Sequence, residues 1–310
     1  MKIVFMGTPV FCEPILEALI EKYNVVGVVT QPDKEVGRKK EILFSKVKEI
    51  ALKHNIKIFQ PIKIKEDYKD ILELNPDIII TCAYGQIIPN EVLDYPKYGC
   101  INVHASLLPK LRGGAPIHRA IQYGHKETGI TIMCVSEKMD SGDIISQESI
   151  KIEDNDIGGS LHDKLSTLGK NLLLKTLPDI IEGTNKRIKQ NEDEVTYAWN
   201  VKREEERLYF TKTALEVYNH IRAFNPFPGT YFILNNKVFK VWDSYILEKE
   251  YKGKAGEIVD IIKDGIVIKT KDRNIVLTKI QPEGKNKMKV KDYLNGKGKY
   301  DFLIGKMLNI

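Results

Sequence analysis

The first half of the chain alternates short apolar runs with amphipathic stretches, and this rhythm constrains the fold more than any other feature of the sequence. Strands that lie between two layers of helices are apolar throughout, whereas strands with one face in water alternate apolar and polar residues. The runs here are of the first kind. The pattern predicts buried strands at 3–6, 25–30, 56–59, 77–82 and 100–103, with helices from Gly7-Thr8-Pro9 to about Glu21 and over 47–53.

Two later apolar runs, Ile130–Val135 and Ile144–Ile150, follow without a long helix between them, and Leu161–Ile181 predicts a long closing helix. A βαβ rhythm gives parallel strands joined by crossovers. We therefore predict an α/β fold, with a Rossmann-like, doubly wound, mostly parallel sheet, for a first domain at residues 1–183.

Residues 184–206 are polar and charged, which predicts a solvated linker without a function of its own. Beyond it we expect one helix, Ala214–Ala223, followed by short β-like runs separated by turn signals. Several short strands in a small region predict a small OB-like β-barrel at residues 207–310, a fold that often carries nucleic acids. The expected strands lie at 230–234, 238–242, 256–262, 265–270 and 274–280.

The net charge of +6 is concentrated in the C-terminal third of the chain. Residues 207–310 hold 20 Lys and Arg against 11 Asp and Glu, a net +9, which leaves −3 for the rest. Such asymmetry favours a polyanionic partner. A generally lysine-rich protein surface is the alternative, and charge does not decide between the two.

The composition sets aside several classes of protein. A chain of 310 residues with 42% hydrophobic and 29% charged residues is ordinary for a globular protein. No stretch approaches the roughly 18 apolar residues of a membrane span, and the first apolar run is too short for a signal peptide. We expect a cytoplasmic protein without a metal site, in which the cysteines are reduced core thiols because they form no C-x-x-C pair: Cys12, Cys82, Cys100 and Cys134.

Two polar residues, Asn102 and His104, end the strand expected at 100–103. Ligands of open α/β sheets bind beyond the carboxyl ends of the strands. Side chains two residues apart on a strand point to the same side. The pair therefore predicts a binding or catalytic site, although both side chains could instead cap backbone groups near a turn.

A second polar group, Asp140, lies in the loop Met139-Asp140-Ser141-Gly142-Asp143, whose small residues allow a sharp turn back toward the strand ends. A carboxylate beside an imidazole can fix its tautomer and raise its basicity. Asn102, His104 and Asp140 then fit acyl transfer without a covalent intermediate. Asn102 and an imidazolium can stabilise an oxyanion, while Asp140 and His104 handle the proton of an attacking amine.

Motifs for other chemistry are missing from the sequence. No G-x-G-x-x-G supports a dinucleotide, and no G-x-x-x-x-G-K-[ST] supports a P-loop. Ser106 lacks a G-x-S-x-G elbow, which argues against a serine hydrolase. The basic cluster Gly37-Arg38-Lys39-Lys40 is expected near the same mouth of the sheet as Asn102, although charge runs are often only solvated.

Six segments in one order carry a resemblance that covers essentially the whole chain: MKIVFMGTP (1–9), AYGQIIP (83–89), GCINVHASLLP (99–109), GAPI (114–117), MDSGD (139–143) and RAFNPFPG (222–229). They resemble the family of formyltransferases that depend on 10-formyltetrahydrofolate. The last segment and the basic barrel resemble the corresponding parts of the family members that act on methionyl-tRNA. The loop Glu41–Lys46 is more apolar than in those members, which puts the details of its tRNA contacts in doubt.

The resemblance implies a role for each matching residue. Asn102, His104 and Asp140 match the catalytic set, and the first domain would be the catalytic domain. Arg38, with Lys39 and Lys40, falls in a loop that enters the acceptor end of initiator tRNA, and the C-terminal barrel would hold the tRNA backbone. Folate would be bound by Ser106, Leu107, Leu108, Pro109, Gln86, Ile87 and Ile88.

The resemblance thus implies an enzyme that moves a formyl group from 10-formyltetrahydrofolate to the amino group of methionyl initiator tRNA, and we expect it to be a monomer. Two other hypotheses stay open. An amino-sugar formyltransferase would share the chemistry of the first domain. A non-catalytic RNA-binding protein would use the barrel and would contain an α/β domain that has lost its activity.

Overall fold

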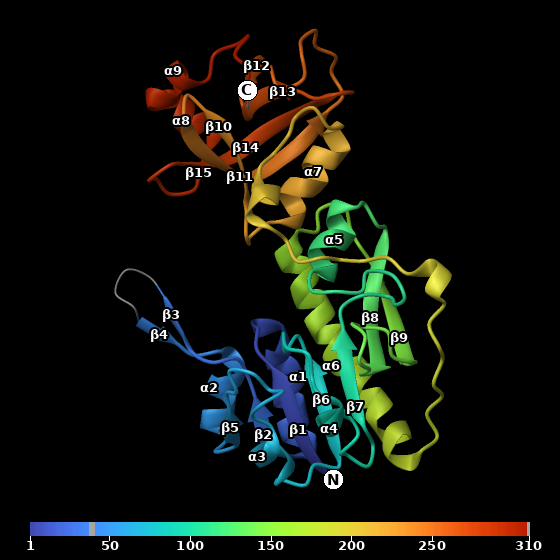
Figure 1. Cartoon of the computed structure of the whole chain (residues 1–310). Helices are drawn as coiled ribbons and strands as arrows, with labels where there is room; N and C mark the ends of the chain where they lie inside the picture. Colours follow the sequence, from blue (N-terminus) through green and yellow to red (C-terminus); the bar gives the residue numbers. More distant parts are fainter. Residues whose placement is uncertain (37–40, 309–310) are drawn as a thin grey trace. The chain divides into compact units, whose positions relative to one another are not determined.

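The computed structural model describes residues 1–36 and 41–308 (Figure 1). These residues fall into two compact units. The first unit comprises Met1–Pro116, Glu127–Lys151 and His162–Trp199, and the second comprises Ile117–Lys126, Ile152–Leu161 and Asn200–Ile310. The domain limits expected from the sequence, 1–183, 184–206 and 207–310, stay a prediction. No helix in the described part of the chain has both the length and the apolar character needed to cross a membrane.

Within the described residues, seven strands form the sheet of the first unit in the order β5-β2-β1-β6-β7-β8-β9. The five strands from β5 to β7 pair in parallel, and β8 and β9 are added antiparallel. The mostly parallel, Rossmann-like sheet is therefore confirmed. Its strands are β1 (Lys2–Gly7), β2 (Asn24–Val29), β5 (Lys57–Phe59), β6 (Ile78–Cys82), β7 (Cys100–His104), β8 (Glu127–Cys134) and β9 (Ile144–Lys151).

Helices cover both faces of this sheet, which explains why its central strands are apolar throughout. On one face, Val4 of β1 belongs to a buried cluster with Ile71 of α3 (Lys69–Leu72) and Val92 of α4 (Asn90–Leu93). On the other face lie α1 (Glu13–Lys22), α2 (Lys46–Lys53) and the long α6 (Gly158–Glu182). There α6 approaches so closely that a Cβ on Gly169 would lie 3.1 Å from Val103 of β7.

The second unit contains a separate antiparallel β-sheet, as predicted. Among its described residues the strand order is β10-β11-β14-β13-β12, with β15 paired to β14. The pairing of β11 with β14 shifts register around Asp243, and β11 pairs with β10 through its first half. The strands are β10 (Thr230–Leu234), β11 (Lys237–Leu247), β12 (Ile258–Ile262), β13 (Gly265–Lys269), β14 (Asn274–Pro282) and β15 (Met288–Lys289).

An apolar core rich in aromatic rings fills the second unit. Phe232 and Phe239 stack in parallel with ring centroids 5.3 Å apart, and Phe302 packs against both. Apolar residues of α7 (Ala214–Ala223) close this core, and Thr213 and Glu216 form a capping box at the start of that helix. Short helical elements complete the unit: α5 (Pro116–Gln122), α8 (Val290–Tyr293), α9 (Lys299–Asp301), a π-helical turn at Leu294–Gly298 and a 3₁₀ turn at Arg203–Glu206.

The segment RAFNPFPG, at 222–229, contacts residues 152–161, which belong to the same unit. The buried guanidinium of Arg222 donates to the carbonyl oxygens of Asp156, at 2.9 Å, and Glu153, at 3.1 Å. The amide of Gly159 donates to the carbonyl of Asn225 at 3.0 Å. The Arg222 side chain therefore has a structural role there, whereas Asn225 contributes its backbone carbonyl.

Several elements differ from the expectation. The strands β3 (Lys34–Val36) and β4 (Glu41–Leu43) form an antiparallel pair that no apolar run announced. The helices α3, α4, α5, α8 and α9 were also missed, because helices of three to seven residues complete too few turns to show a period. Strand β11 runs five residues beyond the expected end at 242 because its register shifts let pairing continue.

Candidate active site

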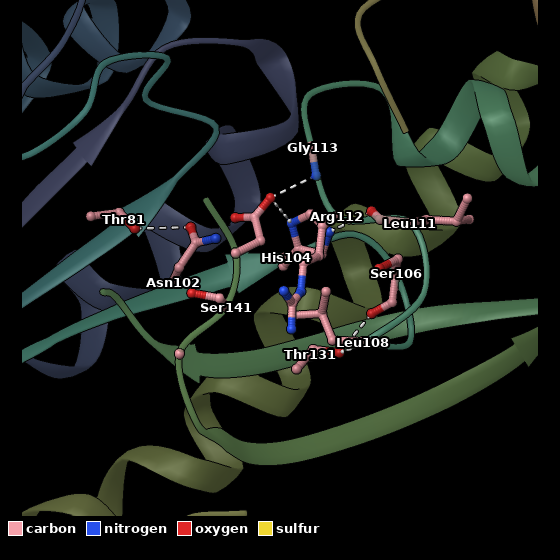
Figure 2. Close-up of polar contacts among 12 residues, drawn as sticks. Thr81, Asn102, His104, Ser106, Leu108, Leu111, Arg112, Gly113, Thr131 and Ser141 are labelled. Carbon is pink, nitrogen blue, oxygen red and sulfur yellow. Dashed lines mark hydrogen bonds and ion pairs between the residues drawn. The ribbon is translucent and has the colours of Figure 1, made fainter. Parts of the chain in front are cut away.

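Asn102 lies in the middle of β7, between the parallel strand β6 and the antiparallel strand β8. The register places it opposite Thr81 of β6 and Met133 of β8. The hydroxyl of Thr81 donates to the Oδ1 atom of Asn102 at 2.8 Å, as Figure 2 shows. Because this bond engages the carbonyl end of the amide, the NH₂ group is the end that faces a ligand as a donor.

His104 is two residues further along β7, so its side chain leaves the same face of the sheet. Its Nε2 atom lies 3.0 Å from the carbonyl oxygen of Leu111. A carbonyl oxygen only accepts hydrogen bonds, so Nε2 carries the proton and donates. In the neutral ring, Nδ1 is then the basic nitrogen, and it lies 3.7 Å from Oδ2 of Asp140.

Asp140 reaches this position from the loop between β8 and β9. Its backbone has a φ of +51°, in the left-handed region, and its Oδ2 accepts a 2.7 Å hydrogen bond from the amide of Gly113. Gly113 has a φ of +119°, and a Cβ at this residue would lie 2.7 Å from the carbonyl oxygen of Ala198. A glycine is therefore required where the backbone meets the carboxylate.

The structure thus brings together the residues that the sequence predicted at the strand end. Figure 2 shows Asn102 and His104 with Leu111 and Gly113 close to the imidazole. An amide donor, a basic ring nitrogen and a carboxylate beside that nitrogen suit a reaction in which negative charge develops on an oxygen while a proton leaves an amine.

The loop Ser106–Pro109 is held rigidly behind this site. The Ser106 hydroxyl is buried and donates to the carbonyl of Lys110 at 2.7 Å. The Thr131 hydroxyl donates to the carbonyl of Ser106 at 2.6 Å and accepts from the amide of Leu108 at 3.1 Å. Leu108 is also buried, Leu107 and Pro109 are half-buried, and the Leu108–Pro109 peptide bond is cis. The side chains of Ser106 and Leu108 are thus used within the protein.

The three residues Gln86–Ile88 take different positions. The Gln86 amide accepts from the amide of Ile64 at 2.9 Å and donates to the carbonyl of Pro61 at 3.1 Å, so it holds the 61–64 loop. Ile88 is buried, whereas the side chain of Ile87 is 68% exposed. Of these three residues, Ile87 presents the largest free apolar surface to a ligand.

The expected tRNA-binding residues Arg38, Lys39 and Lys40 lie outside the described residues. The strands on either side of them, β3 and β4, pair with each other, and their neighbourhood carries exposed apolar side chains: Ile42, Leu43 and Phe44.

The sequence-based reasoning missed the residues that support the candidate catalytic groups. Thr81, Leu111 and Gly113 contact Asn102, His104 and Asp140 respectively. Gly113 lies in a glycine- and proline-rich loop after the strand, which is a sequence signal for a ligand site. A threonine inside a buried strand, such as Thr81, gives no such signal. The segment expected to be a solvated linker also contributes, because the carbonyl of Thr196 accepts from the amide of Arg112 at 2.9 Å.

Candidate metal ligands and the four cysteines are further groups that could bind a ligand. No group of three or more His, Cys, Asp or Glu side chains with metal-binding geometry occurs within residues 1–36 and 41–308. Cys12, Cys82 and Cys100 are buried free thiols and Cys134 is a half-buried one. A hydrogen bond with the Cys12 thiol, and then burial, raises the pKa of Cys82, and burial raises the pKa of Cys100, so these thiols are inert.

Comparison with known proteins defines the class of this chain. Residues 1–177 match the formyl transferase family, and residues 200–298 match the formyl transferase C-terminal domain. The chain therefore belongs to the formyltransferase family.

Among its relatives is the methionyl-tRNA formyltransferase of Bacillus cereus (strain G9842), which is 53% identical over 300 residues, with 96% of each chain covered. Among solved structures, WlaRD, a sugar 3N-formyl transferase crystallised in the presence of dTDP and 5-N-formyl-THF, has a TM-score of 0.68 at 23% identity and covers 92% of this chain and 99% of its own. HypX from Aquifex aeolicus, in complex with tetrahydrofolic acid, has a TM-score of 0.65 at 19% identity over 96% of this chain, which spans 47% of HypX. These two structures support the fold.

Proposed function

We propose that this chain transfers the formyl group of 10-formyltetrahydrofolate to the free amino group of methionyl initiator tRNA. The single observation that carries the proposal is the similarity to methionyl-tRNA formyltransferase along nearly the full length of both chains. The convergence of Asn102, His104 and Asp140 supports it independently, because that arrangement suits formyl transfer to an amine.

In the proposed mechanism, the amine attacks the formyl carbon directly and no covalent bond to the enzyme forms. The NH₂ group of Asn102 donates to the formyl oxygen as negative charge develops there. Nδ1 of His104 accepts the proton that the amine loses, and Asp140, 3.7 Å away, stabilises the imidazolium. The same proton then passes from His104 to the departing nitrogen of the donor as its bond to the formyl carbon breaks.

We propose that the formyl donor binds against the loops Gln86–Ile88 and Ser106–Pro109. The exposed side chain of Ile87 gives an apolar surface suited to a flat ring, whereas the neighbouring Ile88 is buried. Ser106, Leu107, Leu108 and Pro109 would act through the shape of the loop that Thr131 holds, and Gln86 through the 61–64 loop that it holds.

We propose that tRNA contacts the basic second unit through its phosphates, with Arg38, Lys39 and Lys40 contacting the acceptor end. A cluster of lysines in the second unit supports this. Lys287 Nζ lies 3.2 Å from the centroid of the Trp242 ring. Burial and the charges of Lys279 and Lys240 lower the pKa of Lys287. Clustered positive charges of this kind are stabilised when an anion binds among them.

We also propose that the enzyme is a monomer and acts in the cytoplasm without a metal ion. A reaction on charged initiator tRNA requires the compartment in which translation begins.

The decisive experiment measures formyl transfer from 10-formyltetrahydrofolate to charged methionyl initiator tRNA, to methionyl elongator tRNA and to a nucleotide-linked amino sugar. We expect rapid transfer to the first substrate and at least about tenfold lower kcat/KM for the others. Preferred transfer to the amino sugar would replace the proposal by the alternative, and binding of tRNA without any transfer would leave a non-catalytic RNA-binding protein.

A further inference from the structure

A glutamine outside both matched family segments contacts the catalytic loop. Gln190 lies in the connector between the two matched segments, which end at residue 177 and begin at residue 200, and within residues 184–206, which the sequence predicted to be a solvated linker. Its Nε2 atom donates to the carbonyl oxygen of Asp140 at 2.8 Å and to that of Gly142 at 2.8 Å. Both hydrogens of the amide are therefore used on one turn of the loop that presents the catalytic carboxylate.

The other end of the same amide faces Arg112. The Oε1 atom of Gln190 accepts from Nε of Arg112 at 3.0 Å. Arg112 is 3% exposed, and Glu192 of the connector holds its guanidinium with a 2.9 Å ion pair. The orientation of the Gln190 amide is thus fixed, since the arginine can only donate and the two carbonyls can only accept.

The two sides that Gln190 joins are the two sides of the catalytic site. Arg112 stands between Leu111, whose carbonyl fixes the tautomer of His104, and Gly113, whose amide binds the carboxylate of Asp140. The loop of Asp140 is the other side, and its backbone adopts a left-handed φ of +51° that is uncommon for aspartate. One side chain therefore bridges both loops that set the distance between His104 and Asp140.

We propose that Gln190 is a positioning residue for the formyl transfer, which holds the backbone of Asp140 and Gly142 so that the carboxylate faces Nδ1 of His104. This inference rests on the proposed function. Gly113 fixes the carboxylate end of Asp140 and Gln190 fixes the backbone end. Losing either end lets the carboxylate move relative to the imidazole, and displacements of about 1 Å at a reacting centre can reduce rates by about 10²-fold.

Two variants of Gln190 separate positioning from simple stability. Gln190→Met keeps the volume and removes all three hydrogen bonds. Gln190→Glu keeps the acceptor for Arg112 but directs carboxylate oxygens at the two carbonyls. We expect both variants to lower the single-turnover rate on methionyl initiator tRNA by about 10- to 100-fold, with the KM for each substrate changed less than about threefold.

The matched control is Asn191→Ala, because Asn191 is the next residue of the connector and its side chain contacts Asp193 and Glu194 but not the catalytic loop. It should keep the wild-type rate. Thermal melting of every variant accompanies the kinetics, and if Gln190→Met does not fold, Gln190→Glu decides the question.

A wild-type rate in folded Gln190→Glu would overturn the inference, since Gln190 would then serve only to pair with Arg112. A lower melting temperature with an unchanged rate per active site would overturn it too. If the wild-type protein transfers no formyl group to methionyl-tRNA, the proposed function fails and this inference fails with it, so the two failures are distinguishable.

Discussion

At the scale of single residues, the site depends on which end of each polar side chain faces the reaction. The carbonyl of Leu111 assigns the proton of His104 to Nε2, and the hydroxyl of Thr81 assigns the oxygen of Asn102 to the protein side. Both assignments leave the functional atoms, Nδ1 of His104 and the NH₂ group of Asn102, directed away from these protein contacts. In the proposed mechanism, neighbours that take no part in the chemistry thus determine what Asn102 and His104 can do.

Thr81→Val tests the assignment for Asn102. Valine keeps the shape of threonine in the buried strand but cannot donate to Oδ1, so the amide is free to turn. A neutral hydrogen bond contributes about 1 kcal/mol, and we expect kcat to fall by about five- to tenfold with little change in KM. Thr81→Ser keeps the hydroxyl and should keep most of the rate. Equal rates for the valine and serine variants would show that Thr81 does not orient Asn102.

At the scale of elements, the end of β7 and two loops build the site. Parallel pairing of β6 with β7 places Thr81 beside Asn102, and the loops at 105–116 and 136–143 approach His104 from two directions. The backbone at Gly113 lies between the Asp140 carboxylate and the connector, so its conformation is a structural requirement of the site.

Gly113→Ala should therefore reduce both stability and activity. Alanine is strained at a φ of +119°, and its Cβ would lie 2.7 Å from the backbone oxygen of Ala198. We expect a loss of about 1–3 kcal/mol in the free energy of unfolding and a clear drop in turnover. Gly99→Ala is the control, because Gly99 has a φ of +77° but an open surrounding. Urea unfolding and turnover of both variants test this, and wild-type turnover in Gly113→Ala would contradict it.

Much of the first unit was predictable because its signals are local. Apolar runs predicted the strands of both sheets except the two-residue β15, and the spacing of Asn102 and His104 on a strand end predicted a site there. The contacts of Gln190 and Arg112 were not predictable, because a polar residue in a charged segment looks the same whether water or a catalytic loop is its partner. The short strand pair β3–β4 was not predicted for a similar reason, since exposed strands of three residues carry no apolar run.

At the scale of the whole molecule, the two units differ in charge and in the polar groups that they bury. In the second unit, His220 on α7 donates from Nε2 to the carbonyl of Glu205 at 2.7 Å and packs edge-on against Phe224. Burial lowers its pKa from 6.5 to about 4, with Lys212 and Arg119 adding to the effect and the Glu205 contacts opposing it. The folded protein therefore keeps this histidine neutral under conditions in which an unfolded chain would protonate it.

The consequence is a loss of stability in acid. A folded-state pKa below the unfolded value gives stability that is complete above pH 6.5 and is lost as the pH falls toward about 4. At about 1.36 kcal/mol for each pKa unit, His220 should account for a loss of about 3 kcal/mol over this range. His220→Gln keeps a donor for Glu205 and should remove that part of the pH dependence. The free energy of unfolding of both proteins is measured in urea across this pH range. The same dependence on pH in both proteins would contradict the account.

The central claim is that Asp140, held beside His104, serves the transfer step itself. The most direct measurement is the single-turnover rate of formyl transfer to methionyl initiator tRNA by the wild-type protein and by Asp140→Ala, with both substrates saturating and folding checked by circular dichroism. The account predicts that the variant binds both substrates and remains folded but loses about 10²- to 10⁴-fold in rate. A folded variant that transfers the formyl group at the wild-type rate would contradict it.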